Sequence, residues 1–196
     1  NTSSARNLSY LFADCSKLES VNLAGIKTST VTDFNHMFSG CSSLTSLDLS
    51  SFDTSAARDI SYLFNGCSSL RALDLSSFDT SSAETMANLF SSCSKLAEVT
   101  LGESFTWVGS KCFLPQPSAS NIPGADGLWH AVSDGAAYAP SAVPGNKADT
   151  YRAVALTGAG DTSGEDESAG PEEAAREDTI ARPDEGESGR IMASLP

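Results

Sequence analysis

The sequence predicts an α/β solenoid with one short parallel strand and one short helix in each 26-residue rung. The first observation behind this prediction is a fixed period, since four cysteines are spaced 26 residues apart, at Cys15, Cys41, Cys67 and Cys93. The second is that residues 41–64 recur almost verbatim from residue 67. The third is that each copy changes from a strand period to a helix period. A period of this length is typical of stacked units that cannot bury their apolar faces alone.

The two periods are visible within a single copy. Residues 44–49 have the pattern L-x-x-L-x-L, in which inward leucines alternate with polar residues as in a short strand. A turn rich in Ser, Asp and Thr follows at 50–55. Four apolar residues then lie at i, i+3, i+4 and i+7, the spacing of one helix face, at Ile60, Leu63, Phe64 and Cys67.

Equivalent positions of successive copies are apolar, which predicts that like side chains stack in files through the core. The clearest file contains an aromatic ring in every copy, at Phe12, Phe38, Phe64 and Phe90. Leucine files are predicted beside it, for example Leu23, Leu49, Leu75 and Leu101. Burying each such side chain is worth roughly 1.5–3 kcal/mol, so stacking stabilises units that would not fold singly.

Composition divides the chain into three parts. Residues 1–105 form the predicted solenoid, whose first repeat is partial, as expected for a fragment of a longer protein. Residues 106–155 are rich in Pro and Gly and are predicted to close the solenoid as a small β-rich cap, with short strands at 128–130 and 150–154. Residues 156–196 have eleven acidic and three basic side chains and are predicted to be a disordered acidic tail.

Aromatic residues of the predicted cap are expected to plug the open end of the core. They are Phe105, Trp107, Phe113, Trp129 and Tyr151. Trp129 has an alternative role as an exposed platform on which a carbohydrate stacks, and packing in the cap is the favoured interpretation.

The repeat pattern, L-x-x-L-x-L-S-S-F-D-T-S followed by a segment ending L-F-x-x-C, resembles the BspA-like leucine-rich repeats of bacterial surface proteins, of Gram-positive or mycoplasma type. It lacks the asparagine ladder of ordinary leucine-rich repeats. The resemblance covers residues 8 to about 101 and implies a cell-surface or secreted protein that acts in adhesion, anchored through parts outside this sequence. The implied partners are a host extracellular-matrix protein, a glycan or another cell-surface protein.

The cysteines admit two interpretations. Stacked cysteines of neighbouring rungs lie close enough for a disulfide, but an odd number of cysteines and the absence of Cys-x-x-Cys pairs favour buried free thiols. The same spacing argument disfavours a zinc site.

Charge and motif content exclude several classes of function. A net charge of −13 disfavours nucleic acid and anionic membranes as partners, and no apolar run is long enough to cross a bilayer. The two histidines, His36 and His130, lie in different parts of the chain, and no nucleophile or phosphate-loop motif is present. We therefore predict a non-enzymatic protein with no catalytic residue, no cofactor and no metal. Stacked Asp48 and Asp74 suggest calcium, but a solvating role on the strand face is favoured.

Two exposed surfaces remain as candidates for ligand binding. The strand face is predicted to present Asn22, Asp48, Arg71 and Asp74. The helix edge is predicted to present Tyr10, His36 and Tyr62. Extended faces of this kind bind partners in repeat proteins, with aromatic and arginine anchors. The alternative is a structural spacer or stalk of a larger surface protein, with no ligand of its own.

Overall fold

The computed structural model describes residues 2–155. Within them lie five strands and one short 3-10 helix, in the order β1 (Ala72–Leu75), β2 (Glu98–Leu101), β3 (Trp129–Ala131), β4 (Ala137–Tyr138), η1 (Pro140–Ala142) and β5 (Asp149–Arg152). The predicted acidic tail, 156–196, lies outside the described residues.

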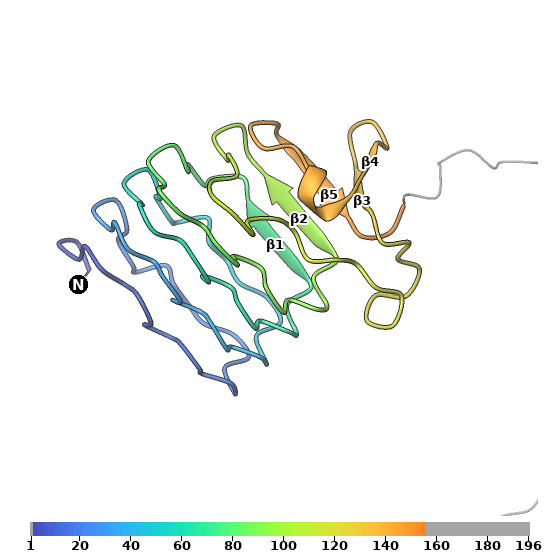
Figure 1. The fold of residues 1–196 in the computed structure, drawn as a ribbon. Helices are drawn as coiled ribbons and strands as arrows, with labels where there is room; N and C mark the ends of the chain where they lie inside the picture. The colour runs from blue at the N-terminus through green and yellow to red at the C-terminus, as the bar shows by residue number, and fades with distance from the viewer. Residues whose placement is uncertain (1, 156–196) are drawn as a thin grey trace, which may run out of the picture. The chain divides into compact units, whose positions relative to one another are not determined.

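The five strands form one mixed sheet in the order β1-β2-β5-β3-β4. β1 and β2 are parallel and 26 residues apart, so Leu73 lies opposite Val99. The three later strands are antiparallel to their neighbours, and β5 pairs with β2 so that Val99 lies opposite Tyr151. Figure 1 shows the chain advancing from its blue N-terminal segments to the orange strands β3, β4 and β5.

The predicted fold class, an α/β solenoid with one strand and one helix per rung, is wrong. The described residues form an open five-stranded sheet and contain no α-helix, only the three-residue η1. The stretch predicted to be helical in the second full copy contains left-handed backbone at Tyr62 (φ 57°) and Gly66 (φ 72°). Right-handed helix cannot pass through such residues, so the segment is a series of turns.

Backbone hydrogen bonds in these turns alternate between two kinds of acceptor. Within the segment, Asn65 N donates to Tyr62 O at 3.0 Å and Cys67 N donates to Phe64 O at 3.1 Å. Between segments, Phe64 N donates to Leu89 O at 3.1 Å and Gly66 N to Ser91 O at 2.8 Å. Each copy is therefore held in register by the next, and backbone groups that a helix would satisfy locally find partners in the neighbouring copy.

The predicted files of side chains are confirmed. Successive rings of the phenylalanine file are nearly parallel, with centroids 5.3, 6.2 and 5.8 Å apart from Phe12 to Phe90. The leucine file is buried throughout, at Leu23, Leu49, Leu75 and Leu101. The apolar spacing in the sequence therefore located the core correctly although the backbone that produces it is not helical.

The cysteines are free thiols, as favoured from the sequence. Cys41, Cys67 and Cys93 are buried, and each thiol donates to a carbonyl oxygen of the preceding copy, at 3.0–3.2 Å. Burial raises the pKa of Cys41 to about 11 and that of Cys93 to about 12.

Most aromatic residues of the closing segment pack as expected. Phe105, Trp129 and Tyr151 are fully buried, whereas Trp107 is half-buried. Trp129 donates from its indole nitrogen to Pro115 O at 2.9 Å, which rules it out as an exposed carbohydrate platform. The prediction for Phe113 is wrong, because its side chain is 45% exposed.

Candidate binding surfaces

The predicted aromatic residues of the repeat edge form a continuous stack, here called the aromatic ridge (Tyr10, His36 and Tyr62). The His36 ring lies 4.8 Å from the Tyr10 ring and 4.4 Å from the Tyr62 ring, with interplanar angles of 8° and 12°. His36 is further held by a 2.6 Å contact between its Nδ1 and Asn35 Oδ1. Tyr10 is 59% exposed and the other two are half-buried.

Repeated local geometry builds the ridge. All three residues have left-handed backbone, with φ of 61°, 56° and 57°, and Asn88 continues the column with φ 55°. Their amides donate to the next copy, Tyr10 N to Asn35 O at 3.0 Å and Tyr62 N to Ala87 O at 2.9 Å. The stacking of the rings therefore follows from the same backbone ladder that sets the register of the core.

On the strand face, three of the predicted residues lie beside two hollows between successive copies. Asn22 and Asp48 line a hollow of about 330 Å³, and Asp48 and Asp74 line one of about 120 Å³. Arg71 lines neither. It is exposed beside β1, where its carbonyl accepts from Ala97 N at 2.8 Å, and its side chain has no ion-pair partner among residues 2–155.

The carboxylates of this face are engaged in their own turns. Asp48 Oδ1 accepts from the Ser50 hydroxyl at 2.7 Å and from Ser50 N at 2.9 Å, and these bonds hold the pKa of Asp48 below its usual value. Asp74 Oδ1 likewise accepts from Ser76 N at 2.8 Å. In the part of the chain that the structure describes, no three His, Cys, Asp or Glu side chains are grouped to hold a metal ion.

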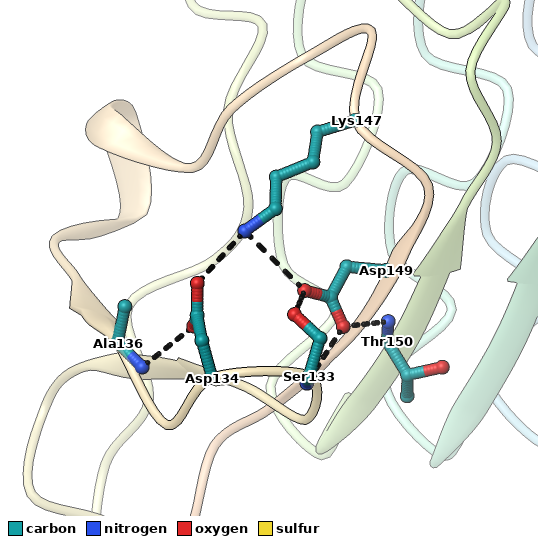
Figure 2. Close-up of polar contacts among 6 residues, drawn as sticks. All are labelled: Ser133, Asp134, Ala136, Lys147, Asp149 and Thr150. Atoms are coloured by element: carbon teal, nitrogen blue, oxygen red, sulfur yellow. Dashed lines mark hydrogen bonds and ion pairs between the residues drawn. The ribbon is translucent and has the colours of Figure 1, made fainter.

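A polar cluster that the sequence did not indicate lies in the closing segment, where Lys147 sits between two carboxylates (Figure 2). Its Nζ lies 3.1 Å from Asp134 Oδ2 and 3.6 Å from Asp149 Oδ2. Ser133 donates its hydroxyl to Asp149 Oδ2 at 2.5 Å, and the amides of Ser133 and Thr150 donate to Asp149 Oδ1. The cluster joins the β3–β4 connection to the chain that enters β5.

Protonation states in the cluster follow from these contacts. The hydrogen bond to Asp134 raises the pKa of Lys147, so the amine stays charged. Burial opposes ionisation of Asp149, but the hydrogen bonds from Ser133 and Thr150 and the charge of Lys147 together outweigh it, and the pKa of Asp149 is lowered. A charged lysine and an ionised aspartate that already accepts three hydrogen bonds provide a structural tie rather than an acid–base pair. The sequence signal was only the Ser-Asp-Gly turn at 133–135, because the partners are 16 residues apart.

These features define a repeat protein with a stacked apolar interior and solvent-facing ridges and hollows. The chain belongs to the family described as "Mycoplasma protein of unknown function, DUF285", which matches residues 1–103. No curated protein and no solved structure matched the chain. Over residues 2–155, no helix has the length and apolar character needed to cross a membrane.

Proposed function

We propose that this chain is a non-enzymatic, cell-surface or secreted binding protein of the BspA-like type, which mediates adhesion by binding a partner protein along the aromatic ridge. The observation that carries the proposal is the ordered, solvent-accessible stack of Tyr10, His36 and Tyr62. Tyrosine is enriched among residues that dominate protein interfaces.

The geometry of the ridge favours a protein partner over a sugar. A sugar packs its C–H face on a free ring face, whereas the inner faces of the ridge are covered by neighbouring rings. The outer face of Tyr10, the ring edges and the two tyrosine hydroxyls remain, and neither hydroxyl has a hydrogen-bond partner among the described residues. Because stacking already fixes the rings, little side-chain entropy is lost when a partner binds.

The test is surface plasmon resonance of the whole chain over immobilised extracellular-matrix proteins. We expect the Tyr10→Ala/Tyr62→Ala double variant to weaken binding at least about tenfold. The Tyr62→Phe variant keeps the stacked ring and removes one hydroxyl, so it should lose less. If Arg71→Ala abolishes binding and the double variant does not, the partner binds the strand face instead. Absence of binding by the unmodified chain would favour the spacer alternative.

A further inference from the structure

A pocket of about 340 Å³ lies where the last repeat copy meets the closing segment. One wall is formed by Asn88 and residues 90–92, and the other by Lys111 and residues 113–116. The walls are joined by a hydrogen bond from Asn88 N to Lys111 O, at 2.9 Å. The ridge residues, the strand-face hollows and the cluster around Lys147 do not line this pocket.

The pocket is built on fixed parts of the core. Its lining includes Phe90, which belongs to the phenylalanine file, and Leu114, and both are buried. Behind the second wall, the Trp129 indole donates to Pro115 O at 2.9 Å, and Gln116 Nε2 donates to Gly127 O at 2.6 Å. A site held in this way is preformed, as ligand pockets usually are.

Phe113 gives the pocket a free aromatic surface. It is 45% exposed, and it stacks on no other aromatic ring among residues 2–155. The rings of the phenylalanine file, by contrast, have their faces covered by one another.

Three polar side chains of the pocket, those of Asn88, Ser92 and Lys111, are also without partners among the described residues. The Asn88 side-chain amide and the Ser92 hydroxyl make no hydrogen bond within the described residues, and Lys111 makes no ion pair there. No carboxylate lines the pocket, although the chain has a net charge of −13. A cation without a neighbouring anion in an acidic chain favours an anionic ligand.

We propose that this pocket binds a carboxylate-bearing sugar, of the sialic acid or uronic acid class. The pyranose ring packs its C–H face on Phe113, its hydroxyls bond to Asn88 and Ser92, and its carboxylate pairs with Lys111. An apolar occupant would remove water from the same polar groups without replacing their hydrogen bonds. The proposal does not depend on the ridge, because the two surfaces share no residue.

Isothermal titration calorimetry with the whole chain tests the proposal, using N-acetylneuraminic acid, glucuronic acid and galactose as probes. We expect at least one acidic sugar to bind at least about tenfold more tightly than galactose and to bind more weakly as salt is raised. Adding 3′-sialyllactose distinguishes a free acidic sugar from the terminal residue of a glycan chain. Equal affinity for galactose, or no saturable binding of either acidic sugar, would overturn the proposal.

Variants separate recognition from folding. Lys111→Gln keeps the stem and removes the charge, and Phe113→Ala removes the ring, so each should weaken acidic-sugar binding about tenfold. Lys17→Gln removes the same charge from an exposed position of the first full copy and should leave binding unchanged. Circular dichroism should show unchanged thermal midpoints for all three variants. Binding that is insensitive to Lys111→Gln would contradict the proposed charge pairing and overturn the assignment.

Discussion

Between residues 8 and 105 the chain is held by apolar files and a repeated backbone ladder, whereas between 106 and 155 buried side chains such as Trp129 and Tyr151 are accompanied by polar pairs that do not recur. The repeat part has one ion pair, Arg58 to Glu84 at 2.5 Å, and both side chains are largely exposed. The closing segment contributes the Lys147 cluster, a pair between Arg152 and Glu98 at 2.7 Å, and a contact between His130 and Asp126 at 3.1 Å.

This difference shows how the sequence of each part determines its structure. In the repeat part, every copy presents the same surface to the next, so apolar matching and backbone bonds suffice. The closing segment has no periodicity to match, and its strands are positioned by backbone pairing with β2 and by side-chain pairs that occur only once. The first part should therefore be sensitive chiefly to lost volume and the second also to lost charge.

The largest expected effect is that of removing a ring from the phenylalanine file. Phe64→Ala should lower the free energy of unfolding by about 3–5 kcal/mol, because the ring is fully buried between Phe38 and Phe90. Urea denaturation measures the change. Phe113→Ala is the matched control, and its exposed side chain should change stability by about 0.5 kcal/mol or less. Similar losses in both variants would contradict the file as the source of stability.

The second-largest expected effect is on the reactivity of the buried cysteine thiols. With its pKa raised from 9.0 to about 11, Cys41 has about a hundredfold less thiolate at pH 8 than an ordinary cysteine. Iodoacetamide at that pH should therefore modify exposed Cys15 first and leave Cys41, Cys67 and Cys93 intact in the folded chain. Peptide mass spectrometry identifies the modified sites, and all five cysteines should react in urea. Early modification of Cys67 would show that the core opens.

A smaller loss is expected when the buried carboxylate of the closing segment is neutralised. Asp149→Asn should lower the free energy of unfolding by about 1–3 kcal/mol, because an amide nitrogen would face donors that now bond to a carboxylate. Asp134→Asn is the control, since that side chain is half-exposed and its loss should change stability much less than Asp149→Asn. Urea denaturation followed by tryptophan fluorescence reports on this segment, which contains both Trp107 and Trp129. The reverse order of effects would contradict the assigned role of Asp149.

The smallest effect is a loss of stability in acid. The backbone bond from Ala136 and the contact with Lys147 lower the pKa of Asp134, so the stabilisation is present above the ordinary carboxyl pKa near 3.8 and is lost as pH falls through the lowered value. Thermal midpoints of the unmodified chain should therefore fall between pH 6 and pH 3. The fall in thermal midpoint should be smaller in the Asp134→Asn variant. An equal fall would show that Asp134 does not contribute to the loss of stability in acid.

Much of the core could be predicted from the sequence because the period itself encodes contacts. Knowing that Phe38 and Phe64 are 26 residues apart was enough to place their rings together. The odd number of cysteines and the absence of Cys-x-x-Cys pairs correctly favoured free thiols. The candidate residues Asn22 and Asp48 were also brought together, in one hollow. Arg71 was not, because it lies just before β1 begins, three residues ahead of Asp74.

Helices were wrongly predicted because a spacing of i, i+3, i+4 and i+7 has more than one structural cause. Tandem turns with left-handed residues at Tyr62 and Gly66 place Leu63, Phe64 and Cys67 inward as a helix would. Tyrosine is not a usual left-handed residue, so composition gave no warning at Tyr10 or Tyr62. Cross-copy hydrogen bonds stabilise that backbone, and they are tertiary contacts that local propensity does not describe.

In the closing segment, the features that were not predicted from the sequence have a different origin. The contact of Ser133 with Asp149 and the exposure of Phe113 depend on single, non-repeated approaches of distant chain segments. Aromatic content predicted correctly that Trp129 and Tyr151 would be buried, but it could not separate them from Phe113. The polar cluster and the pocket beside Phe113 both arise from the path of the chain, which no pattern in 106–155 specifies.

The backbone ladder between copies also constrains how the gene can change length. Because many of the bonds between copies join residue n to residue n+25, an insertion or deletion of a few codons would misalign the bonds that span it, whereas the gain or loss of a complete 78-nucleotide unit would leave the register intact. Each added unit would lengthen the molecule by only about 4.8 Å, the spacing of neighbouring strands. Gain or loss of whole copies would thus change reach in small, uniform steps while preserving the chemistry at the downstream end.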